Sequence, residues 1–226
     1  MDFVLVHGTT QSPAAWERVS APLVARGHRT FAVDLPIDQP DLLADDYARI
    51  AADQVADDVR EPVVVAHSGG GLVLSALGRR LRARHLVWLA AVIPDFAGGR
   101  SLLDQIKADV TGMFGEEWPQ WDGDDPTEAA YFLFHSCDLA TLRWAVGTLR
   151  TWRPVAAYGE TPGPAPDVPS TYVLPREDRT LTPTWMRAAS RDRLGVDAVE
   201  VAGDHCPHVA YSDLVAGLLT GVSSPS

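Results

Sequence analysis

Residues 62–74 have the sequence PVVVAHSGGGLVL, which predicts a strand, a sharp turn and a helix. Its apolar first half favours a buried strand, and its second half has the apolar spacing of a helix. Ser68 stands at the turn between them, with the small residues Ala66 and Gly70 two positions to either side. A serine can project from so sharp a strand-to-helix turn only where its neighbours are small, because the two backbones pass close together there.

Two interpretations of Ser68 remain open on this stretch alone. Ser68 can be a nucleophile, because the N–H of Gly69 at the helix start would point toward negative charge that develops beside the serine. The stretch can also be an ordinary glycine-rich turn in which the serine only caps a helix. Short motifs of this kind also occur by chance, so the rest of the chain has to decide.

Strand and helix patterns alternate along most of the chain. This alternation predicts an α/β fold with a mostly parallel central sheet of about six strands and helices on both faces. The predicted strands are residues 3–6, 29–33, 62–66, 85–90, 171–174 and 198–201. The predicted helices are residues 12–27, 42–59 and 72–81, a segment that starts at Thr182, and residues 212–220.

Residues 95–169 break this alternation. Helical patches are predicted there at residues 101–114, 127–135 and 138–150. A proline- and glycine-rich linker at 158–169 then leads back to the sheet. We therefore expect a core domain formed by residues 1–94 and 170–226, with an inserted helical cap and linker at 95–169.

The inserted segment is rich in aromatic residues. Apolar ligand pockets are built from such side chains, so cap aromatics such as Trp118, Phe132 and Trp144 are candidates for substrate binding. The same side chains could equally serve only to hold the cap together. The residue types do not distinguish these two roles.

Composition and charge exclude several function classes. The chain has 226 residues, of which 46% are hydrophobic, and its 30 acidic and 19 basic residues give a net charge of −11. A negative field of this size repels nucleic acids and anionic membranes, so neither is expected as a partner. The only cysteines, Cys137 and Cys206, have no metal-like spacing, and neither a metal nor another cofactor is expected. The N-terminal apolar run is too short for a signal peptide, and the chain has few cysteines. Both features predict a cytoplasmic protein.

The polar residues that can carry chemistry follow the predicted strands. Ligands of an open parallel sheet bind beyond the carboxyl ends of its strands. Ser68 follows the third predicted strand, Asp178 the fifth and His205 the sixth. This chain order of nucleophile, acid and histidine is that of the α/β-hydrolases. An imidazole activates a serine hydroxyl, and a carboxylate orients the imidazole, so we expect Ser68, His205 and Asp178 to form a catalytic triad.

Other residues near these three are alternatives. His208 is a rival base, but His205 comes sooner after its strand, where the loop can still reach Ser68. Asp204 and Glu177 are rival acids, and Asp204 adjoins His205 too closely in sequence to orient its ring well. His7 and His67 are expected to have structural roles.

The motifs FVLVHG at residues 3–8, AHSGG at 66–70 and GDH at 203–205 resemble those of the α/β-hydrolases, in particular the group of plant methylesterases and hydroxynitrile lyases. The resemblance implies the same triad, with the backbone N–H groups of Thr9 and Gly69 as the oxyanion hole. Ala66 stands where glycine is commoner, but alanine is also small.

The same resemblance argues against one activity of the group. Hydroxynitrile lyases carry threonine at the position of Gly8 and lysine at the position of Cys206, and both are missing here. Cleavage of cyanohydrins by that mechanism is therefore not expected.

These observations predict a serine hydrolase. Its expected substrate is a small to medium apolar carboxylic ester or related acyl compound, cleaved through an acyl-enzyme. One alternative is an enzyme of the same fold that acts as a lyase or cyclase or cleaves a carbon–carbon bond. Another is a receptor-like binding protein with little turnover, because a fold does not determine a function.

Overall fold

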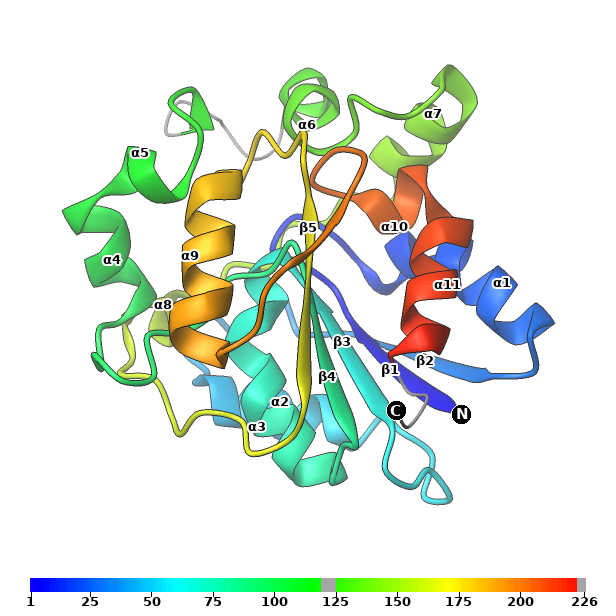
Figure 1. Ribbon diagram of the computed structural model, residues 1–226, viewed down its shortest axis with the longest axis horizontal. Helices are drawn as coiled ribbons and strands as arrows, with labels where there is room; N and C mark the ends of the chain where they lie inside the picture. The colour runs from blue at the N-terminus through cyan, green and yellow to red at the C-terminus, as the bar shows by residue number, and fades with distance from the viewer. Residues whose placement is uncertain (119–124, 223–226) are drawn as a thin grey trace.

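The computed structural model describes residues 1–118 and 125–222. A single sheet of parallel strands has the order β2-β1-β3-β4-β5-β6 (Figure 1). The strands are Asp2–Val6 (β1), Arg29–Val33 (β2), Val63–His67 (β3), His85–Leu89 (β4), Ser170–Pro175 (β5) and Val199–Val201 (β6). The predicted α/β class and the predicted strands are confirmed.

Helices cover both faces of the sheet because the strands are apolar on both sides. In β1, Phe3 and Leu5 belong to one buried cluster, and Val4 and Val6 belong to the other. Alternate residues of a strand point to opposite faces, so each cluster marks one side of the sheet. One side is covered by α1 (Glu17–Ala25) and α11 (Ser212–Gly221), and the other by α2 (Ala44–Ala52), α3 (Gly71–Leu81) and α9 (Pro183–Leu194).

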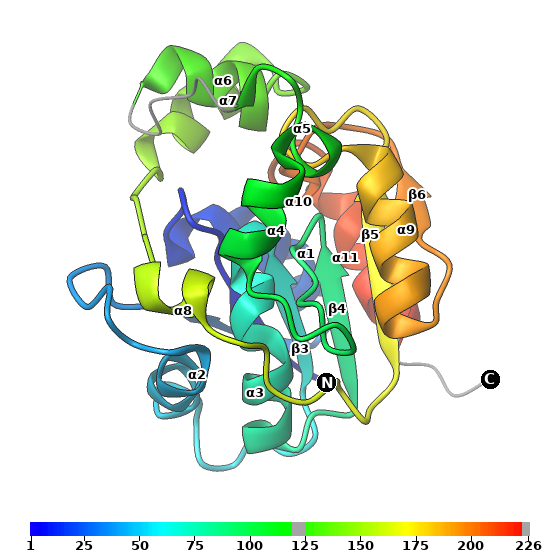
Figure 2. The ribbon, with the colours of Figure 1, turned by 90° about the vertical axis from the view of Figure 1, so that its left-hand side faces the viewer.

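Another set of helices lies between β4 and β5 in the chain. These are α4 (Leu102–Ala108), α5 (Val110–Met113), α6 (Pro126–Leu133), α7 (Leu139–Gly147) and α8 (Val155–Gly159). Helices α5, α6 and α7 lie beyond the carboxyl ends of the strands, at the top of both views (Figures 1 and 2). This segment therefore lies over the edge of the sheet where Ser68 is found.

Some predicted helices differ from the structure at their ends. The helix predicted at 42–59 is shorter, because α2 ends at Ala52 and the Gln54 side chain then pairs with the backbone of Asp34. The helix expected from residue 12 begins as a 3-10 turn, Pro13–Trp16 (η1). The Ser12 hydroxyl does not cap this turn but donates to the carbonyl of Thr148. Two short helices were not predicted, namely α8 and Pro207–Ala210 (α10).

The turn after β3 is a strained elbow. Ser68 has a φ of +51°, in the left-handed region that residues other than glycine seldom adopt. Ser68–Gly70 forms a short 3-10 turn (η2) that runs directly into α3. A side chain at Gly71 would overlap the carbonyl oxygen of Val92, and one at Gly69 would overlap the methyl group of Thr9. Gly71 and Gly69 are therefore required because the backbone of Val92 and the side chain of Thr9 approach them closely.

We expect Gly71→Ala to destabilise the fold, because its new methyl group would meet the backbone of Val92, which cannot move aside as a flexible side chain can. The free energy of unfolding should fall by roughly 3 kcal/mol, measured by denaturant unfolding. Gly217 in α11 is the matched control, since a methyl group there meets nothing within 4 Å. Gly217→Ala should stabilise the protein by about 0.5–1 kcal/mol. Equal effects of the two substitutions would contradict this account of the elbow.

Candidate active site

Ser68, His205 and Asp178 form one chain of hydrogen bonds. His205 Nε2 lies 2.9 Å from Ser68 Oγ, and His205 Nδ1 lies 2.7 Å from Asp178 Oδ2. The ring of His205 is 1% exposed, whereas Ser68 is partly open to solvent. Because the Asp178 carboxylate accepts a hydrogen bond from Nδ1–H, the imidazole is oriented so that Nε2 faces the serine hydroxyl.

The backbone after β5 holds the Asp178 carboxylate in place. Asp178 Oδ1 accepts hydrogen bonds from the N–H groups of Thr180, at 2.7 Å, and Leu181, at 3.0 Å. The other oxygen, Oδ2, is left for His205. Both oxygens of this buried carboxylate are therefore used, and its side chain has one fixed orientation.

The loop after β1 lies against the elbow. A Cβ atom added at Gly69 would lie 3.7 Å from the backbone nitrogen of Thr9, so the two expected oxyanion donors are neighbours. His7 supports this loop, because its Nδ1 donates to the carbonyl of Gly8 at 2.8 Å and its Nε2 accepts from the N–H of Leu35 at 3.1 Å. Burial lowers the pKa of His7 to about 4, so the ring is neutral at pH 7 and can make both bonds.

The rival residues do not make the contacts of a base or an acid with Ser68 or His205. His208 is fully buried against the ring of Trp16, with centroids 4.5 Å apart, and burial lowers its pKa to about 3. The carboxylate of Asp204 accepts from the backbone N–H groups of Ser136 and Cys206, at 2.8 and 3.0 Å. Glu177 accepts from the backbone N–H of Gly203.

His67 lies directly behind His205. Its Nε2 donates to the backbone carbonyl of His205 at 2.8 Å, and the two rings are 4.7 Å apart. The ring of His208 lies 4.6 Å from that of His67. Burial holds the pKa of His67 well below its usual value, so the ring of His67 is neutral at pH 7. The contacts agree with the structural role predicted for His67.

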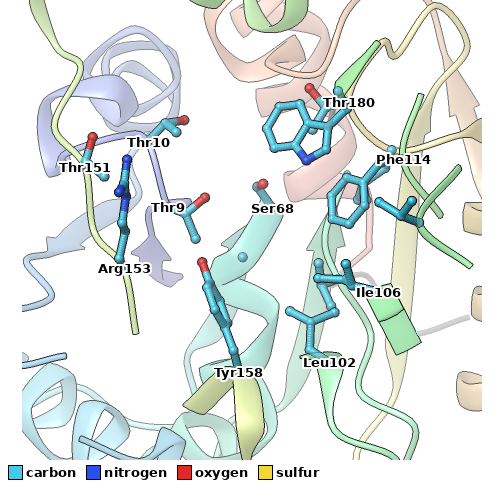
Figure 3. A pocket seen from close by; sticks show the side chains of 15 residues that line it. Thr9, Thr10, Ser68, Leu102, Ile106, Phe114, Thr151, Arg153, Tyr158 and Thr180 are labelled. Atoms are coloured by element: carbon cyan, nitrogen blue, oxygen red, sulfur yellow. The ribbon is translucent and has the colours of Figure 1, made fainter. Parts of the chain in front are cut away.

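A cavity of about 470 Å³ opens beside Ser68 (Figure 3). Most of its lining is apolar, and it includes the positions of Thr9 and Gly69. The lining residues are Thr9, Thr10, Ser68, Gly69, Val92, Leu102, Ile106, Val110, Phe114, Trp118, Thr151, Arg153, Tyr158, Thr180 and Leu181. A space of this size suits a small organic molecule.

Only one of the three aromatic candidates from the cap lines this cavity. Trp118 does so, stacked on Phe114 with centroids 5.4 Å apart. Phe132 packs edge-on against Trp118 from behind, in a separate buried cluster, and supports the cavity wall without forming it. Trp144 lies beneath the guanidinium of Arg18, also outside the lining. Phe132 and Trp144 are therefore not among the residues that line this cavity.

Several lining residues were missed from the sequence. Thr151 and Arg153 fall between the predicted helical patch at 138–150 and the predicted linker at 158–169, where no structure was expected. Pro154 was a usable signal, because a residue before proline favours an extended backbone. Tyr158 was assigned to the linker, but it lies in α8 and lines the cavity.

The described part of the chain shows neither a membrane span nor a cluster of metal ligands. None of its helices has both the length and the apolar composition needed to cross a bilayer. Within residues 1–118 and 125–222, no three His, Cys, Asp or Glu side chains are grouped as metal ligands would be.

Known proteins share this sequence pattern and this fold. A sequence profile of the alpha/beta hydrolase family matches residues 3–218. Methylesterase 7 of Arabidopsis thaliana is 29% identical over 143 residues, which are 58% of this chain and 55% of that protein. The matched segment therefore spans about half the length of that relative.

Solved structures agree with the fold. Polyneuridine aldehyde esterase has a TM-score of 0.79 at 18% identity, over 99% of both chains. A pyrethroid hydrolase from Sphingobium faniae has a TM-score of 0.80 at 20% identity, over 98% of this chain and 96% of that one. At these identities the likeness establishes the fold alone.

The chain belongs to the alpha/beta hydrolase family. The relative in Arabidopsis confirms the resemblance to the plant methylesterases that the motifs at residues 3–8, 66–70 and 203–205 predicted.

The buried histidines make stability depend on pH. An unfolded histidine has a pKa of about 6.5, so below this pH the unfolded chain binds protons that buried His208, with a pKa of about 3, does not. The free energy of unfolding therefore falls as the pH drops below about 6.5. At pH 5, His208 alone should account for a loss of about 2 kcal/mol relative to pH 7.

We expect His208→Leu to remove that part of the pH dependence, because leucine cannot take up a proton. Urea unfolding at pH 7 and pH 5 measures the difference. If the variant and the natural protein lose equal stability between these two pH values, the buried neutral state of His208 is not the cause.

Proposed function

We propose that this protein is a serine hydrolase that cleaves a small to medium apolar carboxylic ester by a Ser-His-Asp acyl-enzyme mechanism. The observation that carries the proposal is the 2.9 Å contact between His205 Nε2 and Ser68 Oγ at the wall of an apolar cavity. The relative in Arabidopsis is named as a methylesterase, which favours ester hydrolysis here as well.

In the proposed first step, Ser68 Oγ attacks the ester carbonyl carbon while His205 Nε2 takes the hydroxyl proton. The resulting imidazolium is stabilised by the carboxylate of Asp178, 2.7 Å from Nδ1. His205 then returns the proton to the departing alcohol, which leaves an ester of Ser68. Water attacks this acyl-enzyme by the same route, with His205 again as the base, and releases the acid.

Charge on the carbonyl oxygen is stabilised by the backbone N–H groups of Thr9 and Gly69. Removing one such donor typically costs about 10²–10³ in rate, so the positions of both donors matter. His7 donates a hydrogen bond to the carbonyl of Gly8, and the methyl group of Thr9 packs against Gly69. These contacts support a preformed oxyanion hole.

Residues 95–169 act as a cap over the core formed by residues 1–94 and 170–226. Within this cap, α4 supplies Leu102 and Ile106 to one wall of the cavity, and Trp118 lies in the same lining. Such a wall favours an apolar arm of the substrate. The cavity also favours catalysis over the receptor-like alternative, since it opens on Ser68 and not away from it.

The lyase alternative has less support. The residues that the resemblance links to cyanohydrin cleavage are replaced by Gly8 and Cys206. Cys206 is fully buried, its Sγ accepts from Gln11 Nε2 at 3.2 Å, and burial keeps its pKa well above the usual value. A neutral, buried thiol cannot supply the positive charge of a lysine.

We expect Ser68→Ala to lower kcat for ester cleavage about 10⁴-fold or more, because the variant has no hydroxyl to form the acyl-enzyme. Labelling with a fluorophosphonate probe at pH 7.5, read by intact mass, tests the nucleophile independently of the substrate chosen. The natural protein should gain one adduct, and Ser68→Ala should gain none. An unlabelled natural protein at this pH would count against the enzyme and for the receptor-like alternative.

The choice of base is tested by a pair of histidine variants. His205→Ala should lower kcat/KM about 10⁴-fold, because it removes the group that takes the serine proton. His208→Leu should retain kcat/KM within a few fold, since its ring lies behind His67 and away from Ser68. Circular dichroism checks that both variants fold. Loss of activity in His208→Leu with survival in His205→Ala would reverse the assignment.

A further inference from the structure

The segment 149–153, which we call the strap, is bound edge to edge to the loop after β1. Leu149 forms an antiparallel bridge with Gln11. The N–H of Arg150 donates to the carbonyl of Thr10 at 3.2 Å, and the N–H of Trp152 donates to the carbonyl of Thr9 at 2.6 Å. The strap is therefore fixed in position against the loop that carries one proposed oxyanion donor.

An extended backbone sends alternate side chains in opposite directions, and the strap shows this alternation. Arg150 points away from the cavity and pairs with Asp34. Trp152 also points away and is fully buried, edge-on to the rings of His7 and Tyr47 at 5.8 and 5.1 Å. Thr151 and Arg153 point the other way and line the cavity.

The two sides of the cavity differ in chemistry. Figure 3 shows Arg153, Thr10 and Thr151 grouped on one side of Ser68. The opposite side carries the apolar side chains of Leu102, Ile106 and Phe114. Ser68, where the ester carbonyl would lie, stands between the two sides.

Arg153 is the only charged side chain among the described residues that line this cavity. Arg153 is exposed to solvent on one side, and its charge also opposes the burial that raises the pKa of Tyr158 to about 12. The chain as a whole has a net charge of −11, so a positive cavity wall is not a general property of its surface. A guanidinium with hydroxyl groups beside it is suited to bind a carboxylate.

We propose that Thr10, Thr151 and Arg153 form a subsite for a carboxylate on the substrate, which makes the preferred substrate an ester with one apolar arm and one anionic arm. This inference rests on the proposed ester hydrolysis at Ser68. The apolar arm lies against Leu102, Ile106 and Phe114, and the carboxylate accepts hydrogen bonds from the strap side. The distance from this subsite to Ser68 is fixed, because the backbone of the strap is hydrogen-bonded to Thr9 and Thr10.

The test uses pairs of esters that differ only in charge. One pair is 4-nitrophenyl hydrogen glutarate and its methyl-capped diester, with the anion on the acyl arm and release of nitrophenolate as the readout. The other is carboxymethyl phenylacetate and its carboxamide analogue, with the anion on the alcohol arm and release of phenylacetic acid followed by chromatography. The natural protein should favour the anionic member of at least one pair by about 10- to 100-fold in kcat/KM, the range of one charge-assisted hydrogen bond.

Arg153→Gln should abolish this preference by raising KM for the anionic ester about 10- to 100-fold, a larger change than for the neutral ester. Arg153→Lys, which keeps the charge but loses the planar fork, should retain part of the preference. Arg143→Gln is the matched control, because it removes the same charge from an exposed position on α7 outside the cavity. That control should keep the full preference.

The outcomes separate this inference from the proposed function. Cleavage of the neutral esters with no preference for either anionic ester would overturn the subsite and leave the hydrolase intact. The same holds if Arg153→Gln and Arg143→Gln change the preference equally. If the natural protein cleaves none of the four esters and takes no fluorophosphonate label, the proposed ester hydrolysis itself fails.

Discussion

The turn at Ser68 leaves almost no room for side chains, and the other parts of the site are arranged around it. The turn from β3 into α3 has a positive φ at Ser68, and the glycines that follow touch neighbouring loops so closely that a single methyl group would not fit. Gly71 lies against Val92 after β4, and Gly69 lies against Thr9 after β1. The same absence of side chains therefore packs the sheet and leaves the serine hydroxyl exposed at its edge.

Contacts from distant parts of the chain converge on this elbow. Asp178 is fixed by the backbone N–H groups of the turn after β5. Its carboxylate orients His205, which lies in the loop after β6. His67, next to Ser68 in sequence, holds the backbone of His205. Because burial keeps His67 neutral at pH 7, it positions His205 without adding positive charge beside the serine.

The inserted segment supplies the part of the site that could discriminate between substrates. It contributes an apolar wall from α4 and, through the strap, a polar wall with one guanidinium. The strap is hydrogen-bonded to the loop after β1, so the inserted segment is attached to the loop that carries the proposed oxyanion donor Thr9. A site built in this way can vary its substrate through the insert while the core stays the same.

The sequence by itself determined the class of fold and the position of the chemistry. Apolar runs followed by Ser68, Asp178 and His205 predicted parallel strands. The carboxyl ends of parallel strands lie at the same edge of a sheet, so these residues were placed together there. Only the tertiary structure decided which side chains line the cavity. Phe132, Trp144 and Trp118 are alike in sequence, yet only Trp118 reaches the cavity, and Arg153 reaches it from a stretch with no predicted structure. These roles depend on the direction of each side chain, which contacts between distant segments set and local sequence does not.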